Sequence, residues 1–193
     1  SCYSSYDFTD TVETARRARA AAPATPIVVG GYHASARPED FTSLPELFDF
    51  VVVGDGERVL AELAQWAVEG GPRPPTVRVA DCPVEPSELP PYPFRLLERY
   101  RTTAGGRTKL QINLSRGCPH ECTFCMERAK PDRRWRALPP ERAVEELRRL
   151  DEVFPLAGRL LHVTDPLFGM KAEWRREFLE RLAASGLRPR AMW

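Results

Sequence analysis

Residues 109–125 read KLQINLSRGCPHECTFC, and this stretch joins a strand pattern to a cluster of cysteines. Polar and apolar side chains alternate from residue 109 to residue 115, which predicts a β-strand with one apolar face. The polar face of this strand carries Gln111, Asn113 and Ser115. Three cysteines follow in the spacing C-x₃-C-x₂-C, at Cys118, Cys122 and Cys125. The sequence therefore predicts a strand that leads directly into a thiol-rich loop.

The chain beyond this loop alternates helices with strands. Apolar stripes at helical spacing predict helices over residues 141–154 and 171–184. Residues 160–164 are expected to form a strand, and another strand begins within residues 187–193. With residues 109–115 the order is βαβαβ, which is typical of a parallel α/β sheet.

The N-terminal part shows a similar alternation. Apolar, β-branched runs at residues 27–29 and 50–53 predict strands that are buried on both faces. Helices are expected over residues 11–22 and 58–68, and a short helix broken by Pro45 over residues 39–48. Asp10 is the expected N-cap of the first helix, with Glu13 as its capping-box partner. Two or three strands are too few for a complete doubly wound domain. We therefore expect a fragment, with further strands before Ser1 and after Trp193.

A proline-rich segment separates the two patterns. Eight of the 19 prolines lie between residues 72 and 93. Since proline lacks a backbone donor, we expect no regular structure here and interpret the segment as an ordered, extended connector between domains. A flexible linker is the alternative interpretation.

Charge and composition restrict the partners. The 28 Lys and Arg against 27 Asp and Glu give a formal net charge of +1, which argues against binding nucleic acid or an anionic membrane. No run reaches the roughly 20 apolar residues that a membrane span needs. No signal peptide is recognised either, and we expect a cytoplasmic protein whose partners are small molecules.

The three clustered cysteines suit one soft metal centre. Disulfides explain them poorly, because three thiols leave one unpaired and nothing else suggests secretion. A zinc site made of the three thiols and His120 is an alternative, although His120 lies between two of the ligands. A 4Fe–4S cluster held by three thiolates, with one iron left open for a small molecule, is the other interpretation.

Cys118-x₃-Cys122-x-Phe124-Cys125, preceded by a strand, resembles the signature of the radical S-adenosylmethionine (radical SAM) superfamily. The resemblance implies a 4Fe–4S cluster on Cys118, Cys122 and Cys125, whose open iron binds S-adenosylmethionine. It also implies reductive cleavage to a 5′-deoxyadenosyl radical, and a partial (β/α)₆ TIM barrel of which residues 106–193 form the first part.

The same resemblance suggests further residues that bind S-adenosylmethionine. Phe124 matches the family position that contacts the adenine. Asp165, at the end of the second strand, is expected to hold the amino group; an Asp turn before Pro166 is the alternative. Asn113, on the polar strand face, is a further candidate for cofactor binding if that face lines a barrel, and an exposed face of an incomplete sheet otherwise.

Two glycine turns follow the N-terminal strands, and together they resemble the cobalamin-binding Rossmann-like domain of one radical SAM class. This assigns cofactor binding to Gly30, Gly31, Gly54, Gly56 and Glu57, and less firmly to Ser4 and Ser5. The Asp-x-His-x-x-Gly motif of some cobalamin proteins is absent, and His33 stands in the wrong context to replace it.

The combined resemblance implies an enzyme that uses cobalamin and a deoxyadenosyl radical to methylate an unactivated carbon. Alternatives are a cobalamin-dependent radical cyclase or rearrangement enzyme, and a non-enzymatic zinc or iron–sulfur module. Partners would be a small-molecule or peptide substrate and a one-electron donor such as flavodoxin or ferredoxin. The expected domains are residues 1–71 for cobalamin, 72–105 as connector and 106–193 as barrel, and this fragment alone is expected to be inactive.

Overall fold

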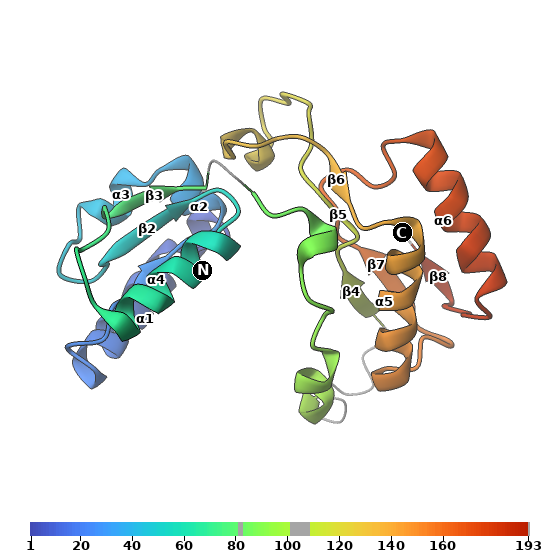
Figure 1. Ribbon diagram of the computed structural model, residues 1–193, viewed down its shortest axis with the longest axis horizontal. Helices are drawn as coiled ribbons and strands as arrows, with labels where there is room; N and C mark the ends of the chain where they lie inside the picture. The colour runs from blue at the N-terminus through green and yellow to red at the C-terminus, as the bar shows by residue number, and fades with distance from the viewer. Residues whose placement is uncertain (81–82, 101–108, 193) are drawn as a thin grey trace. The chain divides into compact units, whose positions relative to one another are not determined.

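The computed structural model describes residues 1–80, 83–100 and 109–192 (Figure 1). The chain divides into two compact units. The first comprises Ser1–Val84 and Pro119–Arg133, and the second comprises Glu85–Cys118 and Arg134–Trp193. Within the described residues each unit contains a parallel three-stranded sheet, which confirms the predicted α/β class.

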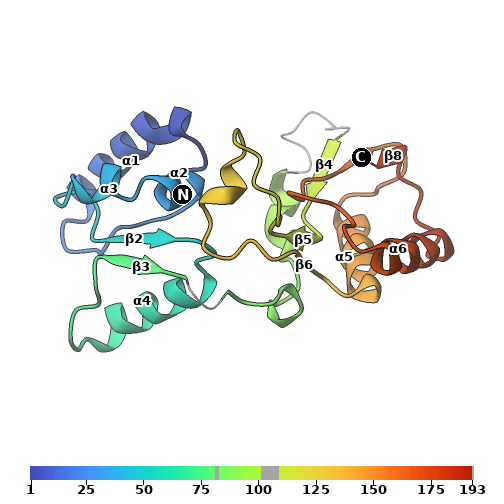
Figure 2. The same cartoon turned by 90° about the horizontal axis from the view of Figure 1, so that it is seen from above.

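The sheet of the first unit has the order β1-β2-β3, with β1 (Val28–Val29), β2 (Phe50–Val53) and β3 (Val77–Val79). Every residue of β2 is buried. Val51 belongs to one core cluster, and its neighbours Phe50 and Val52 belong to another. Because successive strand residues point to opposite faces, the sheet is covered on both sides. Figure 2 shows α1 and α4 on these two sides.

The helices of the first unit begin and end close to the predicted positions, with two exceptions. They are η1 (Ser5–Asp7), α1 (Phe8–Ala21), α2 (Tyr32–Ala36), α3 (Glu39–Thr42), α4 (Glu57–Glu69) and η4 (Met126–Ala129). The short helix predicted over residues 39–48 ends at Thr42, and the expected break at Pro45 agrees with this early end, because a proline disfavours helical backbone at the residue before it. Gly70 follows α4 at a φ of 76°, as the predicted end of that helix requires.

The predicted capping box at Asp10 and Glu13 is also wrong. The box lies six residues earlier, where the backbone N–H of Ser4 donates to the Asp7 carboxylate at 3.0 Å and the Ser4 hydroxyl donates to it at 2.8 Å. The short 3-10 turn that follows continues into α1. The first helix therefore starts at Phe8, three residues before the predicted position.

The expectation that the proline-rich segment has no regular structure is wrong. Val77–Val79 forms β3, which pairs with β2 in the register Val51↔Val77 and Val53↔Val79. The nearby prolines stand before and after this strand, so its own N–H groups remain available to the ladder. β3 is at the end of the strand order, the position in a sheet where neighbouring prolines are tolerated.

The second unit has a parallel sheet in the order β4-β7-β8 and a small antiparallel pair, β5 with β6. Its strands are β4 (Lys109–Ile112), β5 (Ser115–Arg116), β6 (Arg136–Ala137), β7 (Leu160–Val163) and β8 (Ala191–Met192). Its helices are η2 (Pro86–Glu88), η3 (Phe94–Tyr100), α5 (Pro140–Val153) and α6 (Ala172–Ala184). The described part therefore has the predicted βαβαβ order.

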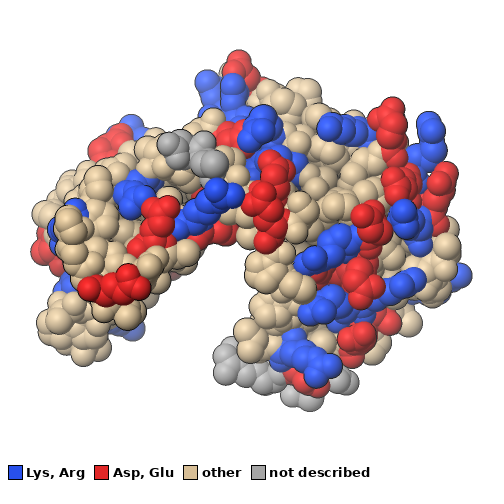
Figure 3. Space-filling view, viewed as in Figure 1, with Lys and Arg blue, Asp and Glu red and all other residues tan. Residues whose placement is uncertain are grey.

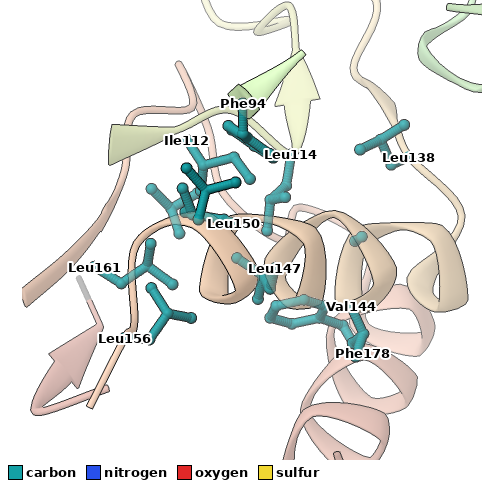
Figure 4. Close-up of a cluster of buried hydrophobic side chains, with 13 residues drawn as sticks. Phe94, Ile112, Leu114, Leu138, Val144, Leu147, Leu150, Leu156, Leu161 and Phe178 are labelled. Atoms are coloured by element: carbon teal, nitrogen blue, oxygen red, sulfur yellow. The ribbon is translucent and has the colours of Figure 1, made fainter. Parts of the chain in front are cut away.

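The core of the second unit confirms the predicted helix stripe. Leu147 and Leu150 of α5 are buried against Leu161 of β7, as Figure 4 shows. Phe178 of α6 completes the same cluster and is fully buried. Burying side chains of this size stabilises the fold by about 1.5–3 kcal/mol each.

The single strand predicted over residues 109–115 is divided in the structure. β4 ends at Ile112, and the chain then turns to pair Ser115 with Ala137. The reason is a side chain: the backbone N–H of Leu114 donates to the Asp165 carboxylate at 2.7 Å. The alternation of burial nevertheless continues through Leu114, which is buried, whereas Gln111 and Asn113 are exposed.

None of the described helices is both long and apolar enough to cross a membrane. Basic and acidic side chains are interspersed on the face that Figure 3 shows. This mixture agrees with the net charge of +1.

Candidate cofactor-binding sites

The glycine turns predicted for cobalamin lie together at one edge of the first sheet. We call this edge, made of Gly30, Gly31, Gly54, Gly56 and Glu57, the carboxyl edge. Its turns follow β1 and β2, and parallel strands end on the same side of a sheet. The backbone N–H of Gly54 donates to the Ser35 hydroxyl at 3.0 Å, so the β2 turn is joined to α2, the helix that follows the β1 turn.

Two of these glycines have backbone conformations that require glycine. Gly31 has a φ of 110° and Gly54 a φ of 91°. A Cβ atom at Gly31 would lie 2.5 Å from the carbonyl oxygen of Cys2. The Cys2 segment is held here, because its N–H donates to the carbonyl of Gly30 at 2.8 Å. The N-terminal residues therefore pack directly against the carboxyl edge.

Ser4 and His33 have structural partners in the first unit. The Ser4 hydroxyl is engaged by Asp7 in the capping box. His33 is buried, stacks on Phe8 and contacts the Asp40 carboxylate through Nε2 at 2.8 Å. This arrangement fixes the imidazole in the core, where aromatic and carboxylate neighbours account for it.

The three motif cysteines are free thiols in the structure. Cys118 is buried in the second unit, whereas Cys122 is exposed and Cys125 partly exposed in the first. The backbone N–H of Cys125 donates to the carbonyl of Cys122 at 3.0 Å, which closes a tight turn between them. Among the described residues, no group of three or more His, Cys, Asp or Glu side chains is arranged to hold a metal ion. The donor set itself, three unoxidised thiols in one short loop, fits a thiolate-bound cluster.

Phe124, the residue predicted to contact adenine, projects into solvent with 89% of its surface exposed. An apolar side chain of this size gains nothing from that position in the free chain. Its exposure leaves the ring face open to a ligand.

Asp165 holds the end of β4 in the second unit. Its two oxygens accept hydrogen bonds from the backbone N–H of Leu114 at 2.7 Å and the hydroxyl of Ser115 at 2.6 Å. Burial raises the pKa of the Asp165 carboxyl, although these hydrogen bonds act in the opposite direction. The indole N–H of Trp135 donates to the carbonyl of Leu167 at 2.7 Å and closes the same region.

Asn113 links the ends of the two neighbouring strands. Its side-chain NH₂ donates to the carbonyl of Thr164 at 2.8 Å, and its side-chain oxygen accepts from the Thr164 hydroxyl at 3.1 Å. Asn113 and Asp165 are therefore brought to one end of the β4–β7 pair, although the sequence placed Asn113 within the first strand.

Sequence reasoning missed a group of buried and half-buried polar residues in the first unit. Tyr32 begins α2 directly after Gly31, Asp55 lies in the turn after β2, and Glu127 and Lys130 follow the third cysteine. The hydroxyl of Tyr32 donates to Glu127, and the Lys130 ammonium lies 3.4 Å from Asp55. The only available signal was position, since these residues directly adjoin the predicted glycine and cysteine motifs.

Comparison with known proteins identifies the N-terminal part. The family model described as "B12 binding domain" matches residues 1–64. Residues 1–64 are therefore similar in sequence to B12-binding domains. The matched range includes β1, β2 and the whole carboxyl edge, so the family recognised from the glycine turns is confirmed.

The fold of the chain is similar to that of a solved structure. The radical S-adenosylmethionine methyltransferase TsrM of Kitasatospora setae, solved with tryptophan substrate and a SAM analogue bound, superposes with a TM-score of 0.70. The match covers 93% of this chain and 36% of that protein, at 23% identity. The described chain therefore has a fold similar to that of this part of TsrM, which agrees with the predicted α/β architecture.

Curated relatives of this chain carry methyltransferase names. The hopanoid C-3 methylase of Methylococcus capsulatus is 28% identical over 93% of this chain and 36% of its own length. An uncharacterized methyltransferase of Pyrococcus horikoshii is 29% identical over 63% of this chain and 29% of its own length. The chain thus spans about a third of the relatives that it matches.

Proposed function

We propose that this chain is part of a cobalamin-dependent radical SAM methyltransferase that transfers a methyl group to an unactivated carbon. One observation carries the proposal: the C-x₃-C-x₂-C motif follows the first strand of the second unit, in a chain whose first 64 residues match a B12-binding domain. A zinc module accounts for the three thiols, but it does not account for that neighbouring domain.

When bound, the cofactors would supply the reactive chemistry. A 4Fe–4S cluster would provide the electron that cleaves S-adenosylmethionine to a 5′-deoxyadenosyl radical, and cobalamin would carry the methyl group. The chain's own residues bind and orient these groups. Cys118, Cys122 and Cys125 would hold the cluster as thiolates. Phe124 would cover the adenine, because its ring is exposed and therefore accessible to a ligand.

The other assigned residues would shape the two cofactor sites. The carboxyl edge would receive the cobalamin, since its glycine turns let a ligand approach the backbone closely. Asn113 and Asp165 would line the S-adenosylmethionine side of the β4–β7 end. We further propose a connector over residues 72–105 between a cobalamin domain (1–71) and a barrel (106–193), a cytoplasmic location and a flavodoxin- or ferredoxin-like electron donor.

The names of the relatives point to different substrates. One relative is named for a hopanoid, another for a carbapenam carboxylate, and TsrM was solved with tryptophan. All three names describe methyl transfer or a methyltransferase, which favours methylation over cyclisation or rearrangement.

The test is anaerobic reconstitution of the intact protein with iron, sulfide and hydroxocobalamin. We expect iron uptake and charge-transfer absorbance that are lost when any of Cys118, Cys122 or Cys125 is changed to Ala. Cys2→Ala is the matched control, because Cys2 is a buried thiol outside the motif and should leave iron uptake unchanged. Stoichiometric zinc without iron would overturn the proposal.

A second measurement separates methylation from the other radical reactions. S-adenosylmethionine with a deuterated methyl group is supplied to the reduced, reconstituted protein together with candidate substrates. Deuterated methyl in the product, formed along with 5′-deoxyadenosine, supports the proposal. A rearranged product without added mass would assign the protein to the cyclase or rearrangement class instead.

A further inference from the structure

The segment that leaves the third cysteine is attached to the carboxyl edge of the first unit. η4 contacts α2, which begins at Tyr32 directly after Gly31. Pro131 packs on the β2 turn so closely that a Cβ atom at Gly54 would lie 3.1 Å from its Cδ. The chain that carries the last two cysteines and the turns predicted to bind cobalamin therefore belong to one packed structure.

A charged cluster of four residues makes this attachment, and we call it the loop anchor: Tyr32, Asp55, Glu127 and Lys130. The Lys130 ammonium lies 3.4 Å from a carboxylate oxygen of Asp55 and 3.4 Å from one of Glu127. The Tyr32 hydroxyl donates to the same Glu127 oxygen. Lys130 also stands over the Tyr32 ring, 4.6 Å from its centroid, at a distance suited to a cation–π contact.

The loop anchor is buried to a degree that is unusual for charged side chains. The exposed fractions of the side chains are 15% for Lys130, 9% for Asp55 and 7% for Glu127. Burial, with the hydrogen bond to Glu127, raises the pKa of Tyr32 above its usual value. The phenol therefore remains a neutral donor at physiological pH, and a single ammonium stands between two carboxylates.

Buried ion pairs add little net stability over apolar side chains of similar size, because the desolvation cost offsets the attraction. They do fix geometry, since removing one partner leaves the others charged and buried. Apolar side chains would shield this loop from solvent equally well if stability were the only requirement. The geometry of the loop anchor is thus suited to setting position.

We propose that Tyr32, Asp55, Glu127 and Lys130 are positioning residues that hold the Cys122–Cys125 loop at a fixed place relative to cobalamin on the carboxyl edge. The inference rests on the proposed function, because it assumes that the edge binds cobalamin. None of the four residues is assigned a catalytic role. Each acts through the backbone of the turn or loop that carries it.

The experiment measures amide hydrogen exchange in the intact protein, with and without hydroxocobalamin. In the wild-type protein we expect cobalamin to slow exchange at the carboxyl edge and also in residues 122–133. In Lys130→Met we expect exchange in residues 122–133 to be about tenfold faster. Cobalamin should still bind and protect the edge in this variant, but it should no longer protect residues 122–133.

Two further variants separate a positioning role from general loss of stability. Arg19→Met removes a different ion pair of the same unit, which joins Arg19 to Asp49 at 2.5 Å just before β2. It should lower the melting temperature yet leave the cobalamin-dependent protection of residues 122–133 unchanged. Glu127→Gln combined with Lys130→Met removes one negative and one positive charge and should recover most of that protection.

The outcomes are distinguishable. If the wild-type protein does not retain hydroxocobalamin, the proposed function fails and this inference fails with it. If cobalamin binds but protects residues 122–133 equally in wild type and Lys130→Met, the proposed function stands and the loop anchor is only structural. Should Lys130→Met be too unstable to purify, Tyr32→Phe gives the same test, since it removes one hydroxyl and keeps the ring.

Discussion

The hydroxyl of Ser115 donates a 2.6 Å hydrogen bond to the carboxylate of Asp165, which is 50 residues away in the sequence. The other oxygen of Asp165 accepts from the backbone N–H of Leu114. Both oxygens of this carboxylate therefore serve to hold the chain where β4 ends. Asp165 thus has a structural role in the free protein, whether or not it also contacts a cofactor.

Asp165→Ala is expected to lower the free energy of unfolding by about 2–3 kcal/mol, because the buried N–H of Leu114 loses a charged acceptor. Urea unfolding followed by tryptophan fluorescence measures the change, since Trp135 donates to the Ser115 hydroxyl at 3.1 Å. Glu180→Ala, on an exposed surface of α6, is the control and should change the free energy by less than about 0.5 kcal/mol. Equal stabilities of the two variants would contradict the assigned role.

Asp49 and Asp165 are expected to give opposite pH dependences of stability. Burial would raise the pKa of Asp49, but the N–H of Ile27 and the Arg19 guanidinium together hold it below its usual value. A lowered pKa stabilises the fold above the unfolded value of the carboxyl, and this stabilisation is lost as the pH falls through the folded pKa. The raised pKa of Asp165 has the reverse effect, so its contribution is greatest at acidic pH and declines as the pH rises through the folded value.

The measurement compares unfolding free energies of wild type, Asp49→Asn and Asp165→Asn between acidic and neutral pH. The difference between wild type and Asp49→Asn should shrink as the pH falls. The difference between wild type and Asp165→Asn should shrink as the pH rises. Parallel curves for the two variants would show that neither carboxyl has the pKa shift assigned to it.

Gly31→Ala is expected to destabilise the first unit by about 3 kcal/mol, through both positive φ and contact with the Cys2 carbonyl. Gly70→Ala is the matched control. Gly70 has a positive φ of 76° too, but a Cβ atom there would meet nothing within 4 Å. We expect a loss of about 1 kcal/mol at Gly70, from backbone strain alone. Thermal unfolding of the two variants measures the difference, and equal losses would mean that the Cys2 segment moves aside.

The elements that could be predicted from sequence are those whose pattern is local. The stripe through Leu147 and Leu150 gave α5 its correct position, because burial on one helix face repeats every three to four residues. The all-apolar run 50–53 was correctly expected to be buried on both faces. β3 was missed because the eight prolines of the segment predicted irregular structure. The three residues Val77–Val79 lie between these prolines and keep the backbone N–H groups that pair with β2.

The candidate site was predictable only in part for the same physical reason. Glycine turns and closely spaced cysteines are visible because their residues are neighbours in the chain. The contact between Tyr32 and Glu127 joins residues 95 positions apart, and no periodicity links them. Likewise, the acceptor for the N–H of Leu114 is Asp165, two residues after the end of β7 and 51 positions away in the sequence. This contact lies where the predicted strand is divided into β4 and β5.

Phe124→Ala is expected to separate ligand binding from stability. With 89% of its surface exposed, Phe124 contributes little to the core, so the free energy of unfolding should change by less than about 0.5 kcal/mol. If the ring stacks on adenine as proposed, its loss should cost about 1–3 kcal/mol, the range for base–aromatic stacking, which weakens S-adenosylmethionine binding roughly 5- to 150-fold. Anaerobic titration of the reconstituted protein measures that affinity.

Tyr6→Ala removes an aromatic ring that is 96% exposed in the same unit and should leave the affinity unchanged. Unaltered affinity in Phe124→Ala would remove Phe124 from the S-adenosylmethionine site, while the cysteine assignment would stand or fall on iron uptake alone.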